Sequence, residues 1–197
     1  MKPGKLLLGI AAAVVMLGSF AGDAAAGKFS LSASTYRATY NTFELIGLGS
    51  VSCVATLEGT LHSRSFAKVV GSLRGFVEIA PFGRCERGSI SVLSETRPWH
   101  LTYVGFTGTL PAISSYRVAI IGMGLRVTEA FGVSCLIRTE ASEPAIMTFP
   151  ENGTSLREAN LEGTIGRPTC ATRLRLRGNS AAFTSGGGAE GILLVLI

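Results

Sequence analysis

The strongest constraint on the fold of this chain is a repeated alternation of apolar and polar residues with a period of two. The alternation is clear over residues 51–57, 99–103 and 174–177. Successive side chains of a strand point to opposite faces of a sheet, whereas a helix repeats its apolar positions every three or four residues. Glycines separate these segments, as turns with positive φ require. The pattern therefore predicts strands joined by turns.

Further segments are rich in β-branched and aromatic residues, which favour strands. About ten short strands at regular spacing predict an all-β domain, either a sandwich or a barrel of mainly antiparallel strands. The additional strand segments are 75–79, 89–93, 116–121, 132–137 and 192–197.

Two local patterns indicate other elements. Residues 154–161 form the one helix candidate, barely a turn and a half long, with Ser155 as its cap. Gly178-Asn179 is a pair of residues typical of a hairpin turn.

The first 26 residues have the pattern of a signal peptide. Lys2 and Lys5 give a positive start, an uncharged run follows over 6–22, and three alanines at 24–26 supply the small residues that signal peptidase requires. The strongly apolar part, 6–20, is shorter than the about 20 residues of a membrane-spanning helix. A retained N-terminal anchor is the alternative. We predict cleavage near Gly27, a single domain over 27–197, and a protein that is secreted, periplasmic or in the cell envelope.

The mature chain contains four cysteines: Cys53, Cys85, Cys135 and Cys170. An even number in an exported chain predicts disulfides, because the compartment is oxidising. None of the spacings resembles the C-x-x-C pairs of zinc sites, so no metal is expected. Three connectivities are open. We predict Cys53–Cys85 and Cys135–Cys170, because each pair closes a loop of medium length and begins with a Val-Ser-Cys strand.

The composition argues against an enzyme and against a cofactor. Asp23 is the only Asp and leaves with the signal peptide, so a Ser-His-Asp triad cannot be assembled, and no G-x-S-x-G turn is present. Disulfide pairing would remove every cysteine nucleophile. His62 and His100, the only histidines, are expected on the surface. The mature glutamates leave a glutamate-based hydrolase open as an alternative.

Trp99 is the only tryptophan, and alternation places it on one strand face with Leu101 and Tyr103. An exposed face of this kind could stack on a sugar or an apolar ligand, which would make the domain a carbohydrate- or lipid-binding module. A buried face would fill the core. We favour the core position and expect the Trp99 side chain to be largely buried, with Trp99 and Tyr103 kept as candidate ligand-binding residues.

Arg173, Arg175 and Arg177 recur at every second position, so their side chains leave one face of a strand about 6.7 Å apart. Such a row could bind an anionic polymer or lipid headgroups. A solvated strand face, or an edge charged against aggregation, is the simpler interpretation. Nucleic acid is not expected as a partner, because export removes it and no recognised motif accompanies the arginines.

The run Pro-Trp-His-Leu-Thr-Tyr at 98–103, followed by Phe-Thr-Gly-Thr-Leu-Pro at 106–111, resembles a pattern in uncharacterised exported proteins of high-GC, actinobacterial type. In those proteins, as here, one Ser-Cys strand precedes the motif and a second one follows it. The resemblance covers most of the mature chain. It implies no activity, because none is assigned to that family, and it transfers no functional residue.

These observations predict an exported, non-enzymatic β-domain with a structural or binding role in the cell envelope or outside the cell. Its expected partner is an envelope polysaccharide, a lipid or another surface protein. Three alternatives are the binding module that uses the Trp99 region, the glutamate-based hydrolase, and a small outer-membrane β-barrel, for which the mature chain is long enough.

Overall fold

The structure, a computed structural model, describes residues 27–47, 49–109, 112–150, 155–165, 168–169, 174–186, 188 and 190–197. The protein is all-β, as predicted, with one short 3₁₀ turn, η1 (Ser94–Thr96). The predicted signal peptide lies outside the described residues, so its cleavage stays a prediction. No helix within the described ranges is long and apolar enough to span a membrane.

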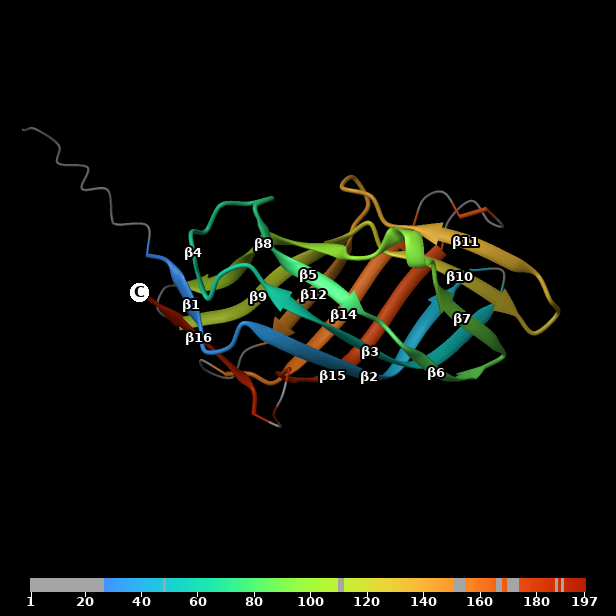
Figure 1. The fold of residues 1–197 in the computed structure, drawn as a ribbon, viewed down its shortest axis with the longest axis horizontal. Helices are drawn as coiled ribbons and strands as arrows, with labels where there is room; N and C mark the ends of the chain where they lie inside the picture. The colour runs from blue at the N-terminus through green and yellow to red at the C-terminus, as the bar shows by residue number, and fades with distance from the viewer. Residues whose placement is uncertain are drawn as a thin grey trace, which may run out of the picture.

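Eight of the described strands form a closed antiparallel barrel (Figure 1). Each strand pairs with the next along this series, and the last pairs back with the first. Of the two architectures predicted, a mainly antiparallel sandwich or barrel, the structure is therefore the barrel. Its strands are β2 (Thr35–Ile46), β3 (Ser50–Leu61), β5 (Leu73–Ile79), β8 (Trp99–Thr109), β9 (Ala112–Ile121), β12 (Ala145–Pro150), β14 (Glu158–Ile165) and β15 (Leu174–Ser185).

The two faces of the barrel wall differ in polarity, as the alternating sequence requires. In β2, Tyr36, Ala38 and Tyr40 are buried inside, whereas Arg37 points outward and is exposed. An eight-stranded barrel has an interior just wide enough for side chains to fill it. Large apolar and aromatic residues fill it here, so most of the barrel is a packed core rather than an open channel.

Small sheets close the two ends of the barrel, and Figure 1 shows them at opposite ends of the long axis. We call the first the lid end; it consists of β13 (Ser155–Leu156), β16 (Ile192–Leu196), β1 (Phe29–Leu31) and β4 (Ser65–Phe66). We call the second the disulfide end; its sheet consists of β7 (Gly88–Val92), β10 (Gly124–Glu129) and β11 (Ser134–Arg138). We include in this end β6 (Phe82–Glu86), which pairs with β3 of the barrel wall and precedes β7.

The predicted disulfide Cys53–Cys85 is present and joins β3 to β6, where the two residues are paired neighbours. None of the described cysteines is a free thiol. Cys135 is buried in β11. Its predicted partner, Cys170, lies outside the described residues, so the second disulfide stays a prediction.

The helix predicted at 154–161 is wrong. Residues Glu158–Ile165 form β14, which pairs with both β12 and β15, and Ser155–Leu156 forms β13. Alternate residues Ala159 and Leu161 are buried in the barrel. A strand forms here despite the weak local preference for a helix, because it supplies backbone hydrogen-bond partners to the two neighbouring strands.

The hairpin predicted at Gly178-Asn179 is also wrong, because both residues lie inside β15 and pair with β2. The glycine serves a close approach instead of a turn. A Cβ at Gly178 would lie 2.8 Å from Cδ1 of Tyr40, so only a residue without a side chain lets the Tyr40 ring pack inside the barrel.

Candidate functional site

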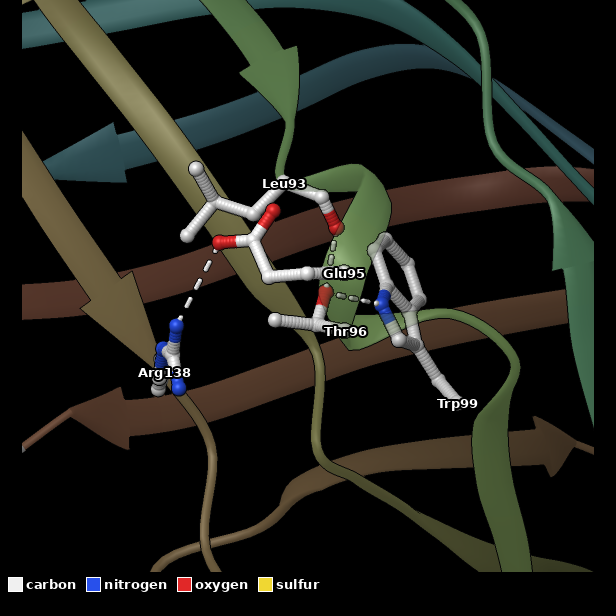
Figure 2. Close-up of polar contacts among 5 residues, drawn as sticks. All are labelled: Leu93, Glu95, Thr96, Trp99 and Arg138. Atoms are coloured by element: carbon white, nitrogen blue, oxygen red, sulfur yellow. Dashed lines mark hydrogen bonds and ion pairs between the residues drawn. The ribbon is translucent and has the colours of Figure 1, made fainter.

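Trp99 lies inside the barrel wall and its side chain is fully buried, as expected. The indole Nε1 donates a hydrogen bond to Oγ1 of Thr96 at 3.1 Å, and that hydroxyl donates to the carbonyl oxygen of Leu93 at 2.7 Å (Figure 2). The one polar atom of the indole is therefore satisfied by η1. A ligand could reach Trp99 only by entering the barrel.

Tyr103 is buried on the same strand face, with Leu101 between it and Trp99, as the alternation predicted. Its ring belongs to an aromatic cluster at the lid end, 5.7 Å from the ring of Tyr116 and 6.2 Å from that of Phe66. The structure thus separates the two candidate residues: Trp99 packs near the disulfide end, and Tyr103 packs near the lid end.

Arg175 and Arg177 point outward from β15 and are exposed, as the alternation predicted, whereas Arg173 lies outside the described residues. They meet a third cation that the sequence analysis missed, Arg117 of β9. The three arginines line a hollow of about 690 Å³ on the outer face of the barrel, which we call the outer groove. Its other polar lining residues are Thr148 of β12 and Glu162 and Thr164 of β14.

The strand registers show which of these cations lack an acid beside them. Arg117 faces Gly105 on one neighbouring strand and Thr148 on the other. Its Nε atom is buried and has no hydrogen-bond partner. Arg175 faces Thr164 and Ile46. Both guanidinium groups therefore have hydroxyl or apolar neighbours in register.

Arg177 has a different environment. Its neighbours in register are two acids, Glu162 on β14 and Glu44 on β2. Its Nε donates a hydrogen bond to Oδ1 of Asn179 at 3.0 Å. Arg177 thus has acids directly opposite it in both paired strands, whereas Arg117 and Arg175 have none in register.

The width of the outer groove indicates the kind of anion that fits. Arg117 and Arg175 stand on strands three positions apart in the barrel, which corresponds to about 14 Å at a strand spacing of about 4.8 Å. A chain with repeated anionic groups could contact cations that stand on strands this far apart, and the threonine hydroxyls between them could donate hydrogen bonds to it.

Three glutamates of the barrel wall have polar partners on its outer face. Glu58 pairs with Arg37 at 2.9 Å, Glu44 accepts a hydrogen bond from Ser50, and Glu78 accepts one from Thr60. Among the described lining residues of the outer groove, Glu162 is the single acid. The groove therefore lacks the pair of facing carboxylates that glycoside hydrolysis uses.

His62 and His100 are both exposed, and their rings flank Phe76 with centroid distances of 4.7 and 5.4 Å. Within the described ranges, no group of three or more His, Cys, Asp or Glu side chains is arranged to hold a metal ion.

Comparisons of the chain with protein-family models, with curated proteins and with solved structures find no match. The resemblance of residues 98–103 and 106–111 to exported proteins of actinobacterial type stays a prediction.

Proposed function

We propose that this protein is an exported, non-enzymatic binding domain whose outer groove binds an anionic polysaccharide of the cell envelope. The observation that carries the proposal is the convergence of Arg117, Arg175 and Arg177 on one groove, two of them without an acid directly opposite in the paired strands. An anionic polymer would supply the missing charges and span the distance between the strands.

Two further observations support an extracytoplasmic, water-exposed barrel. The Cys53–Cys85 disulfide is typical of an oxidising compartment, in agreement with the signal-peptide pattern of the sequence. The outward side chains of the barrel wall include Arg37, Arg175 and Glu162, all exposed. A lipid-facing barrel needs an apolar belt at such outward positions, so these charges favour contact with water.

The test is retention of the purified protein on immobilised dextran sulfate, with neutral dextran as the blank. We expect binding to the charged polymer that weakens with salt. Replacing Arg117 and Arg175 by Gln should weaken it about five- to thirtyfold, because each exposed charge contact contributes up to about 1 kcal/mol. Arg175→Gln alone should show part of the loss and keeps the half-buried Arg117 in place.

The matched control replaces Arg64 and Arg126 by Gln; both are exposed and neither lines the outer groove. This double variant changes the net charge by the same amount and should retain nearly all of the binding. Equal weakening in the two double variants would show a response to net charge alone and would refute the groove as a site.

A further inference from the structure

Arg74 of β5, an arginine apart from the outer groove, lies at the mouth of the barrel beneath the lid end. Its guanidinium stacks over the ring of Phe66 with 4.7 Å between the guanidinium carbon and the ring centroid. One of its terminal nitrogens donates a hydrogen bond to Oγ of Ser72. Its Nε atom is buried and has no hydrogen-bond partner. One donor of this cation is therefore unused in the closed barrel.

No carboxylate balances the charge of Arg74 in the part of the chain that the structure describes. The two ion pairs found there join Arg37 to Glu58 and Arg138 to Glu95. Burial lowers the pKa of Arg74. The hydroxyls of Tyr116 and Tyr103 act in the opposite direction and raise it. Burial raises the pKa of Tyr116, so that hydroxyl is uncharged at neutral pH. A partly buried cation with neutral neighbours is the arrangement that an incoming anion would complete.

Behind Arg74 is a cavity of about 30 Å³ whose walls are almost entirely carbon. The rings of Phe66, Tyr116, Phe149 and Phe183 line it. That volume holds a water molecule, but a water needs polar partners, and apolar cavities of this kind stay dry. The site thus combines one cationic group at its mouth with an apolar interior.

The cover of this cavity is the part of the barrel with the shortest strands. Phe66 belongs to β4, which has two residues and, among the described strands, pairs with β1 alone. Lys68 lies in the connection that follows, with its Nζ atom 5.4 Å from the ring centroid of Phe29, and Val69 and Val70 beyond it are exposed. A displacement of β4 would remove the Phe66 ring from the cavity and open the cavity beside Arg74.

We propose that the lid end binds a small aliphatic monocarboxylate. Its carboxylate accepts hydrogen bonds from the Arg74 guanidinium, and its chain takes the place of the Phe66 ring among the aromatic side chains. A monoanion matches the single uncompensated charge, and a planar carboxylate matches the planar guanidinium. This site is separate from the outer groove and does not depend on it.

The test is calorimetric titration of the purified protein with hexanoate and with hexanol, which share a chain length and differ in charge. We expect hexanoate to bind one per protein and about tenfold or more tighter than hexanol, since hydrogen bonds to a charged group are the strong ones. In Arg74→Leu this preference should disappear. In the control Arg64→Leu, which removes an exposed charge from the same end, it should remain.

The variant Phe66→Ala removes the ring that closes the cavity and should tighten the binding of both compounds while the preference for hexanoate remains. Equal affinities for hexanoate and hexanol in the natural protein would overturn the proposal. So would a preference that survives in Arg74→Leu, or an absence of hexanoate binding in both the natural protein and Phe66→Ala. Retention on dextran sulfate should be the same in Arg74→Leu as in the natural protein, which separates this site from the outer groove.

Discussion

The two ends of the barrel are closed in different ways. At the disulfide end a covalent bond, Cys53–Cys85, joins β6 to the barrel wall, and Trp99 is anchored through its indole nitrogen. At the lid end the closing strands are held by backbone pairing and by a cluster of rings around Phe29. The one described cation packed among aromatic rings beside a cavity, Arg74, is also there.

The difference shows which end is suited to open. A covalent link resists separation of its strands, whereas strands of two or three residues contribute few hydrogen bonds and separate locally before the whole domain unfolds. The lid end is therefore the expected site of motion and the disulfide end the fixed part of the molecule. Four measurements test whether the two ends differ in this way.

The largest effect is expected from removing a fully buried ring at either end. Trp99→Ala and Phe29→Ala should each lower the free energy of unfolding by about 3–5 kcal/mol, because both leave a cavity in the core. The two variants should differ in hydrogen exchange. Phe29→Ala should accelerate exchange in β1 and β16 while the Trp99 emission stays blue-shifted, as for a buried indole. Equal acceleration at both ends in Phe29→Ala would show that the ends open together.

Removing the described disulfide should have the next largest effect. The double variant Cys53→Ala and Cys85→Ala should lose about 2–5 kcal/mol in urea unfolding, because the bond restricts the unfolded chain. Exchange should increase in β6 and β7 and change little in β1. A variant that loosened the lid strands most would contradict the assignment of the disulfide to the fixed end.

Alkaline pH should destabilise the fold through its buried tyrosines. Burial raises the pKa of Tyr116, at the lid end, and of Tyr40, toward the disulfide end, above the usual value. Below about pH 10 both tyrosines are neutral in the folded and in the unfolded chain, so neither lowers the free energy of unfolding. As the pH rises further only the unfolded chain ionises, so stability falls by about 1.4 kcal/mol per pH unit for each such tyrosine until the folded pKa is reached.

The check is a series of urea unfolding curves from neutral to alkaline pH. Tyr116→Phe and Tyr40→Phe should each make the decline less steep. If neither variant changes the slope, these hydroxyls do not control the alkaline limit. A change in Tyr116→Phe alone would place the pH sensitivity at the lid end.

The smallest effect is expected at an exposed ion pair of the disulfide end. Nη2 of Arg138, in β11, lies 3.4 Å from Oε1 of Glu95, in η1, and both side chains are largely exposed (Figure 2). Arg138→Met should change the free energy of unfolding by less than about 1 kcal/mol, as is usual for surface pairs. A loss comparable to that of the disulfide variant would mean that this pair, and not the covalent bond, holds the end closed.

The sequence predicted the local character of the fold well, because alternation reports directly on which side chains face inward. Trp99, Leu101 and Tyr103 are buried together as expected, and 75–79 and 116–121 lie in strands. The closure of the barrel could not be predicted, since β2 and β15 are far apart in the sequence and neither carries a signal of its partner. Residues 154–161 were assigned to a helix because Ser155 is a suitable cap, a local signal that says nothing of the pairing with β12 and β15.

The candidate site was predicted only in part, for the same reason. The outward row of Arg175 and Arg177 follows from alternation, but Arg117 joins it only because the barrel wall brings β9 near β15. The alternation of 116–121 would have placed Arg117 on an outer face, though not on this one. Nothing in the sequence indicated Arg74, because a single arginine in a strand is ordinary. Its lack of a hydrogen-bond partner at Nε and its aromatic neighbours are visible only in the structure.

The pairing of β1 with β16 constrains the order in which the chain can fold as it is synthesised. Lys28 and Ile197 exchange backbone hydrogen bonds of 2.7 and 2.8 Å across the lid. On this edge β1 therefore has no partner until β16, near the other end of the chain, has been synthesised. During that interval the backbone edge of Phe29–Leu31 that faces β16 is unpaired. A chaperone that holds the emerging chain would find its binding segment there, and a protease that removes incomplete chains would find its cleavage segment in the same place.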